Sequence, residues 1–389
     1  MPSVAVTLED TTLREGEQTP GVVFTGRDKR EVAEALGEAG IEYLEVGTPV
    51  IGSSEFRTIS ELAATEGMPT LIGWNRGLRS DLEASFAAGL TAVHIGLPSS
   101  RLHVEDKFGR DFQWVIDTAA ELIGFARMEG ARFISVSAED MGRADLSFLL
   151  EYAEAARQAG ATRMRLSDTV GCLRPGQVAE IVSALRGSVD LDLQVHMHND
   201  FGLAQANVLA GVEAGASQVH VTVNGLGDRA GIAALHQVVP ALELMLGIPT
   251  GIDMTALPRL STLVTRITGL PVAHNEPVVG RRVFTHESGI HVEGMLKVAS
   301  TFAALDPESV GRNHEFTLGK QSGSQALAHV LTEAGVPVDR DQARELLPLI
   351  RELAEAMGGT VSPTVAAALA RHVLVPDALS PTVEATGSV

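Results

Sequence analysis

The feature that most constrains this chain is a regular alternation of short apolar runs and amphipathic stretches from residue 4 to residue 246. The apolar runs have the length of β-strands, and the stretches between them repeat apolar residues with the period near 3.6 that helices show. The predicted strands are Val4–Leu8, Tyr43–Gly47, Thr70–Trp74, Ala92–Leu97, Phe133–Ser137, Arg163–Ser167, Leu191–His198 and Val219–Asn224. The clearest predicted helices are Arg27–Ala39, Asp111–Met128, Leu146–Ala159 and Gly231–Leu246.

Eight such units predict an α/β fold, the closed (β/α)8 or TIM barrel. Several helices end at a glycine before the next strand, which is a common C-terminal stop, as at Gly40, Gly89, Gly160 and Gly215. A doubly wound open sheet is the alternative. The absence of a G-x-G-x-x-G motif after the first strand disfavours it.

The alternation stops near residue 270, and the chain is expected to have four parts. Residues 1–270 form the catalytic barrel. Residues 271–323, rich in His, Gly and charge, form a linker or lid subdomain that contributes to the active site. Residues 324–375 form a helical C-terminal subdomain, and residues 376–389 form a disordered tail.

Composition narrows the function. The chain has 30 basic and 49 acidic residues, a net charge of −19, which argues against nucleic acid or an anionic membrane as a partner. Its single cysteine, Cys172, excludes an internal disulfide framework and suits a reducing compartment. No apolar run has the ~20 residues of a membrane span, and the N-terminus lacks a signal pattern. We therefore expect a cytoplasmic protein.

In a barrel of this type the C-terminal ends of the strands carry the active site. That rule gathers polar residues from all eight strands in one mouth. The candidates are Asp10, Arg14, Glu15, Gln18, Glu45, Asn75, Arg76, Ser99, His103, Ser135, Ser137, Glu139, Asp168, Thr169, His196, His198, Asp200 and Asn224.

His196-Met-His198 is the sharpest local pattern. Alternate residues of a strand point the same way, so both imidazoles face one side and Met197 faces the other. With Glu15 nearby they can supply two nitrogens and one oxygen to a catalytic metal. Spacing alone leaves a second interpretation equally open, in which both histidines are hydrogen-bonded barrel residues.

Other features have two interpretations as well. Arg14 can form a surface ion pair with Glu15, or offer fixed donors to a developing oxyanion, which its position at a strand end favours. The Gly225-Leu226-Gly227 loop is expected to be a plain turn rather than a phosphate cradle. Cys172 is expected to be an inert small apolar residue, and His94 and His220 to be structural.

Together these residues resemble the acyl-CoA condensing enzymes of the homocitrate synthase and 2-isopropylmalate synthase family. The motifs are Asp10-Thr-Thr-Leu-Arg-Glu-Gly-Glu-Gln18, His196-Met-His-Asn-Asp200, Val223-Asn-Gly-Leu-Gly-Asp-Arg-Ala-Gly231, His286-Glu-Ser-Gly-Ile-His-Val-Glu-Gly294, Gly311-Arg-Asn-His and Leu318-Gly-Lys-Gln-Ser-Gly323. The homocitrate synthases of the nitrogen-fixation type are the branch that they most resemble.

The resemblance implies a TIM barrel that binds a divalent cation (Mg, Mn, Zn or Co) and uses acetyl-CoA as co-substrate. The implied metal ligands are Glu15, His196 and His198, with Asn224 at or near the metal. The implied reaction joins acetyl-CoA to a 2-oxo acid in a Claisen-type condensation and then hydrolyses the thioester. Arg14 would stabilise the developing oxygen charge, His291 would be a catalytic histidine from the region after the barrel, and Thr169 would contact the substrate carboxylate. A homodimer is expected.

The resemblance has departures. Phe302 stands where a tyrosine is usual, Ile232 where asparagine is common, Asp228 where glutamate is common and Gln321 where histidine is common. No function is carried over from the family at these four positions.

The 2-oxo acid is expected to bear a distal anionic group. Ser135 stands where lysine-pathway homocitrate synthases place a substrate-binding arginine, and Ser137, Arg76, Gln18 and Glu45 complete the expected substrate contacts. Arg76 could equally pair with Asp81 or Glu83. A 2-phosphonomethylmalate synthase using phosphonopyruvate is the main alternative, and an isopropylmalate- or citramalate-type synthase is less favoured.

Two other classes remain: a lyase resembling 3-hydroxy-3-methylglutaryl-CoA (HMG-CoA) lyase, and a non-catalytic barrel. The motifs around His291 and Gly319–Gly323 disfavour the lyase, and the combined presence of Arg14, Glu15, His196, His198 and His291 disfavours the binding module.

Overall fold

The computed structural model describes residues 6–374. These residues form two compact units, one ending at Gly280 and one beginning at Arg281. The predicted tail at 376–389 and the predicted strand start at Val4 lie outside the described residues.

The first unit is a closed barrel of eight parallel strands in sequential order, with β1 pairing both β2 and β8. The prediction of a TIM barrel is therefore confirmed. The strands are β1 (Thr7–Asp10), β2 (Tyr43–Gly47), β3 (Thr70–Arg76), β4 (Ala92–Gly96), β5 (Phe133–Glu139), β6 (Arg163–Asp168), β7 (Asp192–Met197) and β8 (Gln218–Val221).

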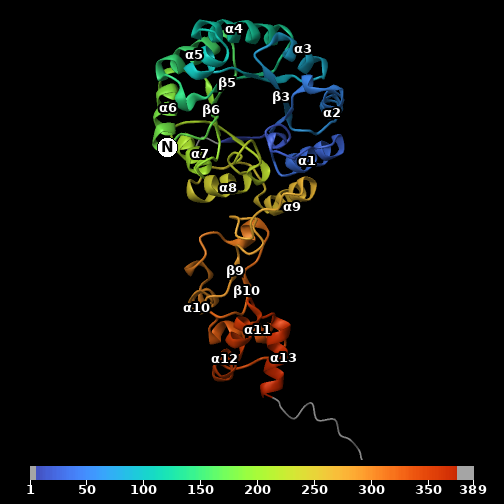
Figure 1. Ribbon diagram of the computed structural model, residues 1–389, viewed down its shortest axis with the longest axis vertical. Helices are drawn as coiled ribbons and strands as arrows, with labels where there is room; N and C mark the ends of the chain where they lie inside the picture. The colour runs from blue at the N-terminus through green and yellow to red at the C-terminus, as the bar shows by residue number, and fades with distance from the viewer. Residues whose placement is uncertain (1–5, 375–389) are drawn as a thin grey trace, which may run out of the picture. The chain divides into compact units, whose positions relative to one another are not determined.

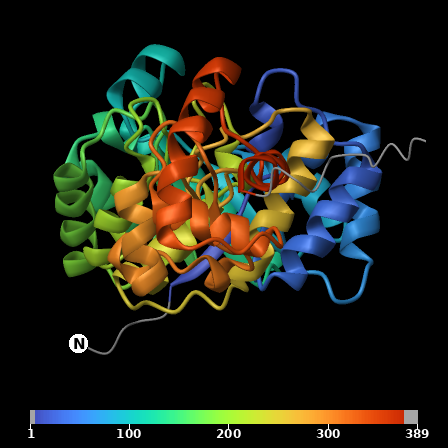
Figure 2. The ribbon, with the colours of Figure 1, turned by 90° about the horizontal axis from the view of Figure 1, so that it is seen from below.

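Helices surround the strands in a ring (Figure 1). The blue and green wall helices stand on opposite sides of the barrel in Figure 2. These helices are α1 (Gly26–Glu38), α2 (Ser53–Ala63), α3 (Arg79–Ala87), α4 (Phe112–Met128), α5 (Leu146–Ala159), α6 (Pro175–Ser188), α7 (Ala204–Glu213), α8 (Leu235–Pro240) and α9 (Leu257–Thr268).

Local chemistry sets several helix ends. Thr25 forms a capping box with Asp28 at the start of α1, and Asp111 accepts a hydrogen bond from the amide of Trp114 at the start of α4. Gly160 ends α5 with a φ of 101°, a left-handed conformation that costs glycine little. These signals explain why the predicted bounds of α1, α4 and α5 lie within one residue of the observed bounds.

The eighth strand–helix unit differs most from the prediction. Strand β8 ends at Val221, three residues early, because a turn follows in which Asn224 has a φ of 59°. The helix expected over 231–246 is confined to α8 and a short π-helical turn, Ala241–Met245. A change of backbone direction after β8 is invisible to apolar periodicity.

Charged side chains fill the lower interior of the barrel. Arg165 on β6 donates from Nη2 to Glu9 at 2.5 Å, from Nη1 to Glu45 at 2.8 Å and from Nε to Gln194 at 2.6 Å. Arg163 on the same strand donates to Glu9 as well. Removing one member of such a buried network leaves a charge unpaired, at a cost of about 3–5 kcal/mol.

The second unit is mainly helical. It contains β9 (Thr285–His286) and β10 (Glu315–Phe316), which pair in parallel, and four helices: α10 (Gly289–Lys297), α11 (Ser324–Glu333), α12 (Arg340–Met357) and α13 (Pro363–Leu374). Its core is formed by Leu318, Leu327, Leu346, Ile350 and Ala367 among others. No helix in residues 6–374 has the length and apolar character needed to cross a bilayer.

Candidate active site

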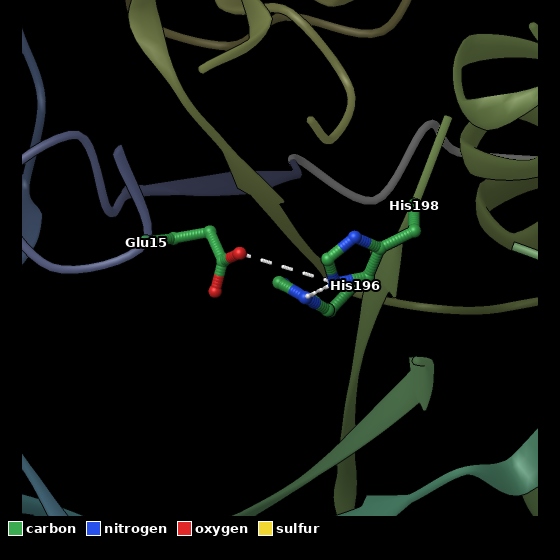
Figure 3. Close-up of side chains that lie close together, drawn as sticks. All are labelled: Glu15, His196 and His198. Carbon is green, nitrogen blue, oxygen red and sulfur yellow. Dashed lines mark hydrogen bonds and ion pairs between the residues drawn. The ribbon is translucent and has the colours of Figure 1, made fainter. Parts of the chain in front are cut away.

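Glu15, His196 and His198 come together at the C-terminal ends of β1 and β7. The Nε2 atoms of the two histidines are 3.1 Å apart, and Oε1 of Glu15 lies 4.0 Å from Nε2 of His198 (Figure 3). All three residues are buried, with exposed fractions between 2% and 6%. The alternation predicted for His196-Met-His198 is observed, because Met197 packs in the core.

The electrostatic environment keeps both imidazoles neutral. Burial lowers the pKa of His196 well below its usual range, with His220 and His198 adding to the effect. Burial also lowers the pKa of His198, although the Glu15 carboxylate opposes it. Neutral imidazole is the form that binds metal ions.

The geometry of these three residues fits a divalent cation. Their ligand atoms all lie within 4.8 Å of one another. Metal–ligand bonds of about 2.0–2.2 Å place neighbouring ligand atoms roughly 3 Å apart, close to the observed His196–His198 separation. Two nitrogens and one carboxylate oxygen suit divalent cations such as Zn, Mn or Co and leave coordination positions for substrate.

Arg14 is held beside this group by two carboxylates. Its Nε donates to Glu45 at 2.5 Å and its Nη1 donates to Glu15 at 2.5 Å. Among the described residues no hydrogen bond involves Nη2, and Arg14 lines the cavity at the barrel mouth. The second interpretation of Arg14, as a surface ion pair, does not fit a side chain with 10% exposure.

The cavity has a volume of about 180 Å³. Almost all of its lining is polar or charged, with Trp74 as the main aromatic surface. The lining residues are Arg14, Glu15, Gln18, Trp74, His94, His103, Lys107, Ser137, Glu139, Arg165, Ser167, Thr169, His196, His198, Asp228 and Arg229.

Gln18, Ser137 and Thr169 therefore lie where the sequence placed them, around the cavity. Ser135 is fully buried below it, where its hydroxyl lies 2.8 Å from His94 Nδ1 and accepts from Arg163 Nε at 3.0 Å. Glu45 is also fully buried and contacts Arg14 rather than the open cavity.

Two further candidates point elsewhere. Arg76 donates to Asp81 from Nε at 2.8 Å and from Nη2 at 2.9 Å, which is the ion pair that we considered as the alternative. Asn224 donates to the Ser261 carbonyl at 3.1 Å and to Thr265 at 3.2 Å, both on α9. Neither side chain lines the cavity.

His291 lies on α10 of the second unit and is exposed. The ring of Phe302 stacks on its imidazole, with centroids 4.3 Å apart and planes inclined by 28°. Cys172 is exposed too. Partial desolvation of its thiol and the neighbouring Asp168 carboxylate raise its pKa, which leaves it poorly reactive at neutral pH.

The Gly225-Leu226-Gly227 loop is a turn, as expected. The amide of Gly225 donates to Thr222 and the amide of Gly227 donates to the hydroxyl of Thr19. These donors are used within the protein and do not form a phosphate cradle.

Sequence reasoning missed Lys107 and Arg165, and left His103 and Glu139 without a role. Lys107 and His103 lie on a π-helical turn, Leu102–Lys107, after β4. Burial raises the pKa of Glu139, a property typical of groups that exchange protons. Of the missed residues, Arg165 could have been found from the sequence. Arg163-Met-Arg165 places charges at alternate positions of an otherwise apolar strand.

Residues 5–264 match the protein family described as HMGL-like. The chain belongs to the HMGL-like family. Residues 278–357 of this HMGL-like protein match a second family, the homocitrate synthase post-HMGL domain-like proteins. The resemblance inferred from the motifs is thereby confirmed.

Relatives of this HMGL-like protein match nearly its whole length. It is 44% identical to 2-isopropylmalate synthase 2 of Caldanaerobacter subterraneus subsp. tengcongensis, over 90% of this chain and 91% of that protein. It is 44% identical to 2-phosphonomethylmalate synthase of Streptomyces rubellomurinus, over 91% and 95%. It is 40% identical to homocitrate synthase 1 of a Nostoc species, over 89% and 92%. These relatives confirm the prediction of an enzyme, a synthase of the acyltransferase class.

Solved structures of HMG-CoA lyases share the fold. Hydroxymethylglutaryl-CoA lyase from Pseudomonas aeruginosa superposes with a TM-score of 0.64 at 21% identity, covering 72% of this chain and 98% of that chain. The HMG-CoA lyase from Bacillus subtilis gives a TM-score of 0.63 at 19% identity, covering 70% and 97%. At this identity the likeness concerns the fold alone.

Proposed function

We propose that this protein condenses acetyl-CoA with a 2-oxo acid that carries a distal anionic group and then hydrolyses the thioester. The observation that carries the proposal is the group Glu15, His196 and His198 at the barrel mouth, with Arg14 beside it. Acetyl-CoA, the 2-oxo acid and water give a 2-hydroxy acid lengthened by a carboxymethyl group, together with free CoA.

Glu15, His196 and His198 would hold a divalent cation, as Zn, Mn, Co or Mg. When bound there, such a cation supplies Lewis-acid polarisation of the substrate keto group.

Arg14 supplies the next element of the mechanism. Attack by the acetyl-CoA enolate turns the keto oxygen into an alkoxide, and fixed donors aimed at that charge lower the barrier. Glu15 and Glu45 hold two edges of the guanidinium, and Nη2 is left for the substrate oxygen. Since both anchors are themselves buried, Arg14 needs no reorganisation as the charge develops.

Proton transfer requires titratable side chains that can reach the reacting atoms. Glu139 lines the cavity with a raised pKa and is our candidate within the barrel. His291 is our candidate in the second unit, where the ring of Phe302 stacks on its imidazole. Phe302 has no hydroxyl, so it serves as a packing surface for His291 and takes no part in proton transfer.

A distal anion on the substrate is supported by the charge of the cavity. Arg165 and Arg229 line it but use their donors on carboxylates and carbonyls of the protein. Lys107 is different: among the described residues its ammonium has no ion pair and lies 5.1 Å from the ring centroid of Phe108. We propose Lys107, with Ser137, as the recognition site for the distal carboxylate or phosphonate.

The polar lining also bears on the choice among related synthases. A branched apolar 2-oxo acid would bury its side chain against charged groups that then lose hydration, which costs several kcal/mol. A homocitrate-type or 2-phosphonomethylmalate-type reaction therefore fits better than an isopropylmalate-type reaction. The relative named 2-phosphonomethylmalate synthase supports phosphonopyruvate as the second candidate.

We further propose a homodimer. Apolar side chains of the second unit are exposed on α10 and the turn that follows it, with Ile290 at 78%, Val298 at 56% and Phe302 at 45%. Patches of this kind mark protein interfaces. Light scattering coupled to gel filtration gives the mass directly, and a monomeric mass would contradict the proposal.

The function is tested by following CoA thiol release from acetyl-CoA with 2-oxoglutarate, phosphonopyruvate, oxaloacetate, 2-oxoisovalerate and pyruvate. We expect release with one of the two acids 2-oxoglutarate and phosphonopyruvate, abolished by chelator and restored by a divalent cation. Release without any metal dependence would contradict the metal site. Cleavage of HMG-CoA, with no condensation of any acid, would favour the lyase class.

A further inference from the structure

His220 on β8 lies between His196 and two carboxylates in the barrel interior. Its Nδ1 is 2.8 Å from Nδ1 of His196, and its Nε2 is 3.3 Å from Glu9 and 3.7 Å from Glu45. The side chain has no exposed surface. An imidazole buried this deeply must direct its one proton and its one lone pair to fixed neighbours.

The contacts allow one consistent arrangement of protons. Nε2 of His196 faces His198 and Glu15, so binding a cation there requires its lone pair and places the His196 proton on Nδ1. That proton is donated to Nδ1 of His220, which must then accept. The proton of His220 consequently lies on Nε2, the nitrogen that faces Glu9 and Glu45.

Other buried histidines of the barrel lack this connection. His94 contacts Ser135 through Nδ1, and His236 contacts Glu276 through Nε2. Among the described histidines, only His220 contacts one of the three residues of the cation group without belonging to it. Among these buried histidines, His220 is therefore the one placed to affect the cation group.

We propose that His220 is a positioning residue for His196. It holds His196 in the Nδ1-protonated tautomer. Through His220, the negative charges of Glu9 and Glu45 polarise the imidazole of His196, so that its Nε2 becomes a stronger metal ligand. This inference rests on the proposed function, because it concerns the cation group of that function. His220 touches neither substrate nor cation, and its effect is on how strongly His196 binds the metal. Loss of such a partner weakens metal binding by about 10- to 100-fold.

Two substitutions of similar size separate the acceptor role from simple packing. In His220→Asn the amide oxygen stands at the position of Nδ1 and can still accept from His196. In His220→Gln the amide stands at the position of Nε2, toward Glu9, and the acceptor for His196 is lost. His236→Asn is the matched control, because His236 is a buried histidine on α8 that is 2% exposed and whose Nε2 lies 3.1 Å from Glu276 rather than at the cation group.

Co²⁺ is the probe, titrated into metal-free full-length protein and followed by its visible absorption and by calorimetry. We expect His220→Asn and His236→Asn to bind within about threefold of the wild type, and His220→Gln to bind about 10- to 100-fold more weakly. Thermal unfolding followed by circular dichroism checks that each variant is folded. Equal Co²⁺ affinities for the Asn and Gln variants would overturn the inference. If the wild type itself binds no Co²⁺, the proposed metal site fails and the inference with it, which is a distinct result.

Discussion

The ammonium of Lys29 donates a hydrogen bond to the backbone carbonyl of Leu13, 3.0 Å away, from a side chain with no exposed surface. It also donates to the carbonyl of Val46 at 3.2 Å and to Glu55 at 2.6 Å. Leu13 immediately precedes Arg14, and Val46 immediately follows Glu45. One buried lysine on α1 thus joins the ends of the two strands that carry the Arg14–Glu45 contact.

Lys29→Met is predicted to impair both stability and turnover. It leaves the carboxylate of Glu55 and two carbonyls without their donor, at a cost of about 3–5 kcal/mol. It also loosens Arg14, and small misplacements in an active site lower kcat by about 10- to 100-fold. Denaturant unfolding and CoA release measure the two effects. Arg157→Met, which removes an exposed ion pair with Glu154, should leave both within error. An unchanged kcat in folded Lys29→Met would contradict the positioning role.

Arg14→Gln is predicted to lower kcat by roughly 100- to 1,000-fold, because it removes a charged donor from the developing alkoxide. KM for the 2-oxo acid should change much less, since the charge appears only as the bond forms. Steady-state kinetics of CoA release give both constants. Arg79→Gln, at an exposed pair with Glu83, is the control. A rise in KM with an unchanged kcat would show that Arg14 binds the ground state instead.

Lys107→Gln is predicted to raise KM for the preferred acid about 10- to 100-fold, because a charged hydrogen bond is lost. Slow turnover of pyruvate, which has no distal anion, should stay unchanged. The ratio of kcat/KM for the two acids is the measurement. Lys297→Gln, on the exposed surface of α10, serves as the comparison. An equal loss for both acids would argue that Lys107 does not recognise the distal group.

Asp10 should make stability depend on pH. Burial raises the pKa of Asp10 from 3.8 to about 7 in the folded protein. Between pH ~4 and 7 the Asp10 carboxyl is ionised in the unfolded protein but still protonated in the folded protein. The free energy of unfolding therefore falls as the pH rises through this range, by roughly 4 kcal/mol in total. Asp10→Asn removes this effect and can keep the hydrogen bond from the Thr12 amide. The difference in unfolding free energy between wild type and variant should therefore shift in favour of the variant from pH 4 to pH 8. If the unfolding free energies of wild type and Asp10→Asn changed in parallel with pH, that result would contradict the raised pKa of Asp10.

The barrel could be predicted from sequence because its signal is repeated. Each strand buries a short apolar run and each helix a stripe, so errors in single elements do not change the fold. The cation group was predictable for a similar reason: His196 and His198 are alternate residues of one strand, and strand ends meet at one rim. The bounds of the first strand and the last unit were less accurate, since turn geometry such as that of Asn224 leaves little trace in hydropathy.

Side-chain direction was the part that sequence could not provide. Arg76 and Ser135 stand at the strand positions expected of substrate contacts. Arg76 instead pairs with Asp81 on the next helix, and Ser135 is buried beside His94. Lys107 was missed because a π-helical turn delivers it to the cavity from outside the strand. These outcomes depend on competition among neighbours, which a one-dimensional pattern does not contain.

The contact between Glu9 and Arg163 joins positions 154 residues apart, across β1 and β6. Neither charge can be paired until six strands have assembled. The chain between Glu9 and Arg163 must therefore lose its loop-closure entropy before the contact forms and offsets that loss. A chain with only its first four units folded would keep Glu9 hydrated and its lumen open to water. Closure of this barrel is therefore expected to be a late, cooperative step, and fragments that end before Arg163 should not form a dry, native-like interior.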